Sequence, residues 1–167
     1  MALKSLHDLL VDELKDLYNA EKQLTRALPK MAKNATNDKL RRAFEEHLKV
    51  TENQITRLEK VFQELDMTAK GKKCMGMEGI INEGKEMMEE DLDENVLDAA
   101  LIAAAQKVEH YEIASYGTVR TYAQQLGYER IADMLQETLD EESNANEMLT
   151  DIAESEINYQ AMGEEEE

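Results

Sequence analysis

Apolar side chains recur along this chain in alternating steps of three and four residues, the spacing of one face of an α-helix. Proline occurs once and glycine seven times in 167 residues, so little interrupts this periodicity. The pattern predicts an almost entirely helical protein, with long helices over roughly 5–33, 38–66, 93–126 and 128–157.

The predicted helix ends carry typical end signals. Ser5 is a plausible N-cap, with Asp8 three residues later, and Gly127 is suited to a C-terminal stop. The segment Asn34–Asp38 reads as a short turn that supplies the next N-cap. Pro29 lies inside the first pattern, where we expect it to kink the helix or to end its regular part.

The lengths of the connections predict the architecture. Tight turns join the first two and the last two helices, so each pair forms an antiparallel hairpin. The link over residues 67–92 is long enough to cross the full bundle and contains a short helix at Met77–Asp91. Two hairpins joined by a long crossover predict a ferritin-like four-helix bundle, with a plain bundle carrying an ornamented loop as the alternative. We expect a single domain over residues 1–160 and a disordered acidic tail over 161–167.

Composition narrows the class of partner. The 37 acidic and 19 basic residues give a net charge of −18, which disfavours nucleic acids and anionic membranes and argues against a DNA-protecting protein. No apolar run approaches the roughly 18 residues of a membrane span, and the N-terminus lacks the features of a signal peptide. The single cysteine, Cys74, lies in a polar loop, where a thiol can be reactive, but no neighbouring residue marks it as a nucleophile. A cytoplasmic protein is the default expectation.

Each long helix places one potential metal ligand where its apolar stripe calls for a hydrophobic side chain. These residues are Glu21, His47, Glu112 and Glu142. A buried carboxylate is costly unless it is protonated, paired with a cationic side chain or bound to a cation. Lys and Arg are scarce at this level of the stripes, which disfavours a salt-bridge network.

The four residues also fall near one level of the bundle. Glu21 precedes Ala35 by 14 residues and His47 follows it by 12, while Glu112 and Glu142 each lie 15 residues from Gly127. Antiparallel partners at equal distance from their turn lie side by side. Carboxylates together with an imidazole suit iron, as one or two ions, with manganese or zinc as alternatives.

Other polar residues near this level are less clearly placed. Glu109 lies one turn before Glu112 and can reach the same site, although a solvated helix face is the usual position for such a residue. Helical phase does not decide whether Glu141 or Glu142 points inward. We place His110 at the edge of the bundle or in an oligomer contact. Tyr18 and Tyr116 are expected in the core, with hydroxyl groups able to reach a carboxylate.

Three stretches of the chain resemble the YciE/YciF family of bacterial ferritin-like proteins. They are LYNAEKQL at 17–24, KKCMGMEG at 72–79 and DAALIAAAQKVEHYEIA at 98–114, within a resemblance that covers residues 4–157. The resemblance implies a ferritin-like bundle, usually dimeric, related in fold to rubrerythrin and associated with bacterial stress responses.

Rubrerythrin-like metal sites match this sequence in part. Their first-helix Glu, their Glu-x-x-Glu pair and their second-helix His correspond to Glu21, to Glu109 with Glu112, and to His47. Two expected ligands are replaced, by Phe44 three residues before His47 and by Ala145 three residues after Glu142. The resemblance therefore implies a weakened dimetal centre, a single-metal site or a vestige.

Two functions follow from the ligands and the resemblance. The first is a homodimeric stress-response protein with an iron or dimetal site, redox active toward peroxide or dioxygen. The second is a non-enzymatic dimeric scaffold whose metal site is vestigial or empty. The sequence does not identify the substrate or the dimer interface.

Overall fold

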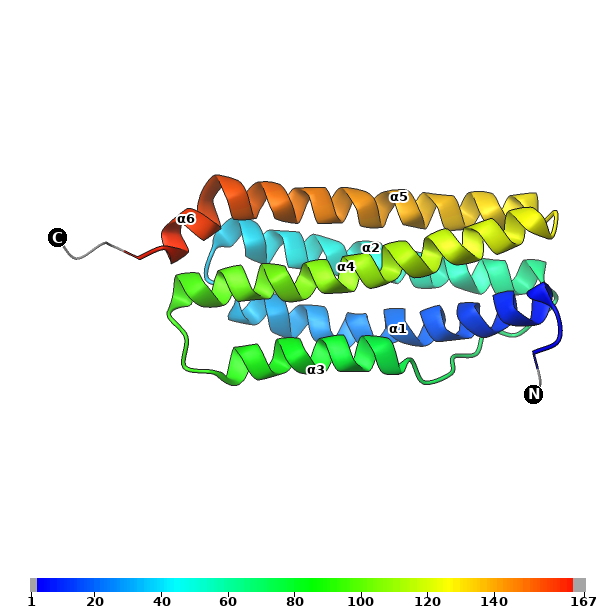
Figure 1. Cartoon of the computed structure of the whole chain (residues 1–167), viewed down its shortest axis with the longest axis horizontal. Coiled ribbons are helices and arrows are strands. Elements are labelled where there is room, and N and C mark those ends of the chain that lie inside the picture. The colour runs from blue at the N-terminus through cyan, green and yellow to red at the C-terminus, as the bar shows by residue number, and fades with distance from the viewer. Residues whose placement is uncertain (1–2, 164–167) are drawn as a thin grey trace.

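The structure of the protein is a computed structural model that describes residues 3–163, and every regular element in that range is a helix. Four long helices lie side by side along the long axis of the molecule (Figure 1). They are α1 (Leu6–Asn34), α2 (Asp38–Glu64), α4 (Glu94–Gln125) and α5 (Glu129–Ile152). The prediction of an all-α protein is confirmed.

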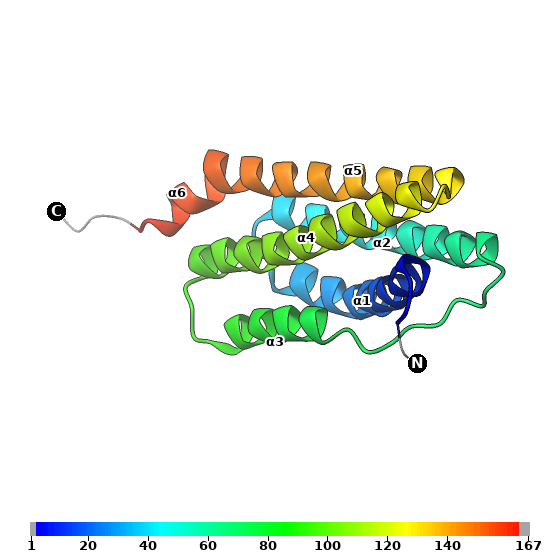
Figure 2. The same ribbon diagram turned by 45° about the vertical axis from the view of Figure 1, so that its right-hand side comes forward.

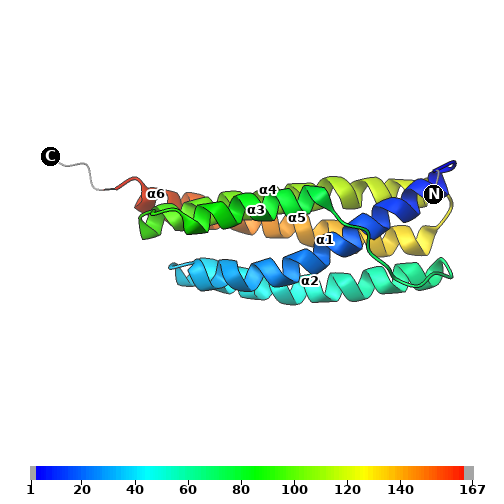
Figure 3. The same ribbon diagram turned by 90° about the horizontal axis from the view of Figure 1, so that it is seen from below.

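The long helices contact one another in a ring, α1 with α2, α2 with α5, α5 with α4 and α4 with α1. Short turns make α1 antiparallel to α2 and α4 antiparallel to α5 (Figure 2). The link after α2 returns the chain to the end where α2 began, so α2 and α4 run in the same direction. Within this link, the shorter helix α3 (Met75–Glu89) packs along α4 and α1 (Figure 3).

The first part of this link is held against α1. A Cβ atom on Gly71 would lie 3.1 Å from Asn19 Cβ, so glycine allows the close approach of the two segments. The Asn19 side chain accepts a 2.8 Å hydrogen bond from the Cys74 amide, and Cys74 caps α3. The helix therefore begins at Met75, two residues earlier than the predicted Met77.

The turn between α1 and α2 is clipped to α4 by a buried carboxylate. Asp98 accepts hydrogen bonds from the Thr36 amide at 2.8 Å, the Thr36 hydroxyl at 2.6 Å and the Asn37 amide at 2.8 Å. Asp98 is only 2% exposed, so these donors also satisfy a group that would be costly to bury alone. The clip fixes the height of the first hairpin relative to α4.

Pro29 does not end the regular part of α1, which continues to Asn34. A proline inside a helix removes one amide donor and leaves one carbonyl without its partner. Pro29 lies on the exposed face of α1, where water can bond that carbonyl.

The C-terminal segment stays helical beyond Ile157, where we expected the chain to fray. A π-helical turn (Ala153–Ile157) leads into α6 (Asn158–Ala161), and both segments contact α4. Ala153 and Ile157 are buried in the core, which holds this segment in place. Residues 164–167 of the predicted acidic tail lie outside the described residues.

Buried apolar side chains form two separate clusters. One joins the C-terminal half of α1 to the N-terminal half of α2, and the other joins the opposite halves of the same helices. The two clusters continue on α4 and α5. Between them, all four long helices bury polar side chains instead of apolar ones. No helix within residues 3–163 is long and apolar enough to span a membrane.

Candidate metal centre

A layer of buried polar side chains crosses the middle of the protein between the two apolar clusters. We call it the polar layer, and each of its members is at most 8% exposed. Each long helix contributes at the point where its apolar stripe is interrupted. The members are Glu21, His47, Thr51, Gln54, Glu109, Glu112, Thr138 and Glu142.

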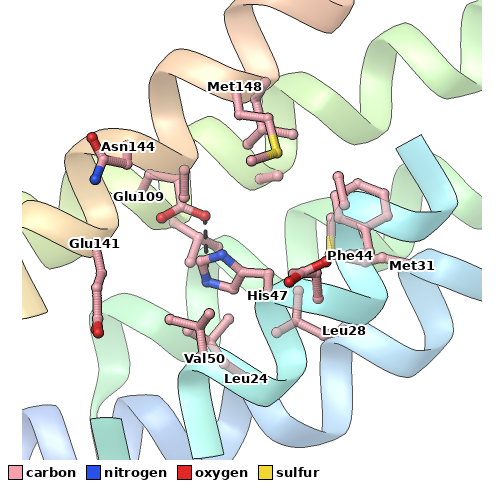
Figure 4. A pocket seen from close by; sticks show the side chains of 16 residues that line it. Leu24, Leu28, Met31, Phe44, His47, Val50, Glu109, Glu141, Asn144 and Met148 are labelled. Atoms are coloured by element: carbon pink, nitrogen blue, oxygen red, sulfur yellow. Dashed lines mark ion pairs between the residues drawn. The ribbon is translucent and has the colours of Figure 1, made fainter. Parts of the chain in front are cut away.

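Four members of the polar layer form a compact group. One ligand atom from each of His47, Glu109, Glu112 and Glu142 lies within 4.8 Å of the other three. His47 Nε2 is 3.6 Å from Glu109 Oε1 and 3.9 Å from Glu142 Oε2, distances too long for hydrogen bonds. Figure 4 shows Glu109 pointing toward His47. The atoms are close enough to share a ligand without satisfying one another.

Several potential metal-ligand atoms of this group lack hydrogen-bond partners. These are both carboxylate oxygens of Glu112, one oxygen each of Glu109 and Glu142, and His47 Nε2. One oxygen of Glu21 is also unpaired. Because buried polar groups are nearly always satisfied, so many unpaired oxygens together fit a group that takes up a cation or protons. The mixed carboxylate and imidazole donors fit a first-row transition metal.

Burial and mutual repulsion control the protonation of these carboxyls. Burial, followed by the charge of Glu142, raises the pKa of Glu21 to about 8, although a hydrogen bond from Tyr116 opposes the rise. Burial and the same neighbour raise the pKa values of Glu109 and Glu112 well above the usual range. Burial lowers the pKa of His47. Without a cation, neutral pH therefore leaves these carboxyls largely protonated and His47 neutral.

The two adjacent glutamates of α5 have different surroundings. Glu142 is fully buried in the group of four. Glu141 is rotated about 100° around the helix, and its side chain is 29% exposed. It accepts two 2.9 Å hydrogen bonds from the Arg57 guanidinium. Glu142 is thus the residue that faces the polar layer.

Sequence analysis missed two residues around these carboxyls. The fully buried Gln54 donates hydrogen bonds to Glu142 Oε1 and, at 3.0 Å, to Glu141 Oε2. Arg57 also donates to the Thr138 hydroxyl at 2.7 Å, so a basic residue does lie at this level. Gln54 lies seven residues after His47, two turns along the same face, and this spacing could have revealed it.

One of the two tyrosines near the site, Tyr116, bonds to the polar layer: its hydroxyl donates a 2.5 Å hydrogen bond to Glu21 Oε1. Tyr18 instead donates to Glu59 at 2.9 Å. Glu21 is fully buried but lies outside the group of four, two of whose members, Glu142 and Glu112, affect its pKa. His110 is exposed.

Cys74 is completely buried, although its position in a polar loop allowed a reactive thiol. Its sulfur lies 3.1 Å from Asp16 Oδ2 and 3.0 Å from the Tyr111 hydroxyl, which itself donates to Asp16 at 2.6 Å. Burial raises the pKa of the thiol. The cysteine therefore serves to anchor α3 rather than to present a nucleophile.

Comparison with known proteins places the chain among bacterial relatives. Residues 5–162 match the family model described as "Domain of unknown function (DUF892)". The chain is 50% identical over 162 residues to Protein YciF of Escherichia coli strain K12, covering 96% of this chain and 98% of that protein.

Solved structures agree with this relationship. The crystal structure of the Escherichia coli stress protein YciF has a TM-score of 0.90 at 50% identity, covering 93% of this chain and 99% of that one. YcfI of Rhodopseudomonas palustris, described as a candidate structural protein, has a TM-score of 0.87 at 45% identity. The match covers 88% of this chain and 94% of YcfI. The protein XCC3681 of Xanthomonas campestris, 22% identical with a TM-score of 0.71, shares the fold over 90% of this chain and 92% of its own. The resemblance drawn from the motifs is confirmed, and the chain belongs to the DUF892 family, with the stress protein YciF among its relatives.

Proposed function

We propose that this protein is a ferritin-like stress-response protein whose polar layer binds iron as one or two ions. His47, Glu109, Glu112 and Glu142 are the proposed ligands, with Glu21 available to a second ion. The proposal rests on four residues from three helices, each of which brings one potential ligand atom within 4.8 Å of the others. Most of their carboxylate oxygens, and His47 Nε2, have no hydrogen-bond partner. Iron bound there would supply redox chemistry toward peroxide or dioxygen.

The surrounding residues support a positioned site. Gln54 holds one oxygen of Glu142, so the other oxygen is left free for a cation. The Tyr116 hydroxyl orients Glu21 in the same way. Residues that hydrogen-bond to metal ligands fix the orientation of those ligands and tune their basicity.

The arrangement of the chain supports the ferritin-like part of the proposal. Two antiparallel helix pairs are joined by a long link, which is the connectivity of ferritin-like bundles. Such bundles hold metal ions with inward-facing Glu and His side chains from their long helices. We extend the proposal to a cytoplasmic homodimer, as the family resemblance implies.

A scaffold without metal chemistry is the second candidate. The description of YcfI as a candidate structural protein favours it. In this case, protons replace the cation, because burial raises the pKa values of Glu21, Glu109 and Glu112. The polar layer would then only position the helices relative to one another.

Metal binding separates the two functions. Protein purified without chelator is analysed for metals and titrated anaerobically with Fe(II) by calorimetry, with Mn(II) and Zn(II) in parallel. We expect binding of one or two ions and a loss of at least about tenfold in affinity in His47→Ala and Glu112→Gln. The exposed Glu45, two residues from His47, provides the control variant Glu45→Gln.

Absence of bound iron after loading, with no effect of His47→Ala, would reject the metal site and favour the scaffold. Anomalous scattering at the iron edge of soaked crystals would count the ions and identify their ligands.

A further inference from the structure

A cleft with a volume of about 280 Å³ lies between α2 and α5 and reaches the edge of the candidate metal centre. We call it the apolar cleft. Its walls come from all four long helices and include Leu24, Leu28, Phe44 and Leu149. His47 and Glu109 also line it, so the cleft connects the surface with two proposed ligands (Figure 4).

Small side chains account for the space. Ala43 on α2, Ala105 on α4 and Ala145 on α5 all line the apolar cleft. Ala145 continues the apolar stripe of α5 one turn beyond Glu142, a position where larger side chains such as Leu135 and Leu149 otherwise fill the core. Larger side chains at these three positions would fill part of the cleft.

The inner part of the apolar cleft carries unpaired polar atoms. His47 is only 8% exposed, and its Nε2 has no hydrogen-bond partner. Glu109 Oε2 is likewise unpaired. The buried end of the cleft is therefore the edge of the polar layer.

The rim of the cleft disfavours anions. Glu46, Glu141 and Asn144 line the cleft together with Met148, which is 51% exposed, and no Lys or Arg is among the described lining residues. The Glu46 carboxylate disfavours an anion at the rim, whereas Glu141 is already paired with Arg57. Most of the remaining lining is apolar, which favours a neutral apolar molecule. An apolar cavity of about 150 Å³ holds benzene, so this cleft suits a molecule of roughly twice that size or smaller.

We propose that the apolar cleft binds a small neutral apolar molecule, an aromatic ring or short aliphatic chain, with its inner end against His47 and Glu109. Binding itself does not need a metal. The role of this molecule as the substrate or product of the metal centre rests on the proposed function.

The test uses the full chain in chelator at pH 7, with ¹³C-labelled Met and Ala methyl groups. The neutral probe is p-cresol, and p-toluate is a matched anion of similar size. We expect p-cresol to shift the methyl signals of Met31, Ala145 and Met148 saturably. The toluate anion is expected to bind at least about tenfold more weakly.

Variants that fill the cleft make the location specific. Ala145→Leu and, independently, Ala43→Leu are expected to abolish the shifts caused by p-cresol. Ala114→Leu adds the same side chain at an exposed position of α4 and is expected to leave binding intact. Binding that persists in both filled variants, or the absence of saturable shifts in the wild type, would overturn the proposal.

A second copy of the chain is the competing occupant of the apolar cleft. In that case, a soluble paramagnetic agent would leave the Met148 methyl signal unbroadened and p-cresol would not shift it, which also overturns the proposal. Iron titration of the wild-type protein separates this inference from the proposed function. Iron binding without saturable p-cresol binding rejects the ligand cleft alone, and p-cresol binding without iron binding rejects the metal site alone. In Ala145→Leu we expect p-cresol binding to be lost and iron binding to be kept.

Discussion

The Tyr116 hydroxyl donates a 2.5 Å hydrogen bond to Glu21 Oε1 in the middle of the protein, and both residues are completely buried. The bond joins α4 to α1 across the polar layer. It also lowers the pKa of Glu21, against the larger effect of burial. Tyr116 therefore opposes the effects of burial and of the Glu142 charge on this carboxyl.

Replacement of Tyr116 by Phe removes this donor and leaves a second oxygen of Glu21 unpaired. We expect the free energy of unfolding to fall by about 1–3 kcal/mol, the cost of an unsatisfied buried polar group. Urea unfolding in chelator at pH 7 measures this loss. Tyr18→Phe is the control, because its partner Glu59 lies in a partly buried position, and an equal loss in both variants would contradict the assignment.

The stability of the metal-free protein should fall as pH rises from about 6.5 to 8. The pKa of Glu21 is about 8 in the folded chain and near 4.5 when unfolded, so in this window the unfolded state binds fewer protons. Ionisation therefore favours unfolding, and Glu109 and Glu112 act in the same direction. Below about 6.5 the lowered pKa of His47 acts in the opposite direction, because its unfolded form takes up a proton.

Urea unfolding in chelator across this pH range measures the slope. Glu21→Gln cannot ionise, so we expect a flatter dependence on pH in this variant. A wild-type stability that rises between pH 6.5 and 8 would contradict the raised pKa values.

Metal binding at pH 7 should release protons. Because Glu21, Glu109 and Glu112 have raised pKa values, a divalent cation must displace protons from the carboxyls that it binds. Calorimetric titration in buffers of different ionisation enthalpy should give a release of at least about one proton per protein. Glu112→Gln should release fewer, and heats independent of the buffer would contradict this account.

Gly76 lies against the ring that anchors α3. A Cβ atom there would come within 2.6 Å of Tyr111 Cε2, and Tyr111 bonds to Asp16 and Cys74. We expect Gly76→Ala to destabilise the fold by about 1–3 kcal/mol, the usual cost of overpacking.

The matched control lies on the same helix. A Cβ atom on Gly79 would meet nothing within 4 Å, so Gly79→Ala should stabilise the protein by about 0.5–1 kcal/mol through helix propensity. Urea unfolding of both variants measures the difference. Equal effects at the two positions would show that Tyr111 does not limit the approach of α3.

The candidate site was largely predictable because helical phase and distance from a turn are properties of the sequence. Glu21, His47, Glu112 and Glu142 each interrupt an apolar stripe, and the structure buries all four. Support from the sequence was weaker for Glu109, because its helical phase is offset from the apolar stripe. The structure nevertheless buries Glu109, which is only 3% exposed. Whether these residues bind metal stays a prediction.

The sequence by itself determined the helical class, the helix boundaries to within a few residues, and the level at which polar side chains interrupt the core. These features depend on periodicity, capping residues and chain length, all of which act locally. Tertiary structure decided the pairing of Glu141 with Arg57, the contact of Gln54 with Glu142, the burial of Cys74 and the apolar cleft. Each of these features depends on how the helices are rotated and spaced relative to one another. A side chain at the edge of an apolar stripe faces solvent or a neighbouring helix, depending on how closely that helix packs.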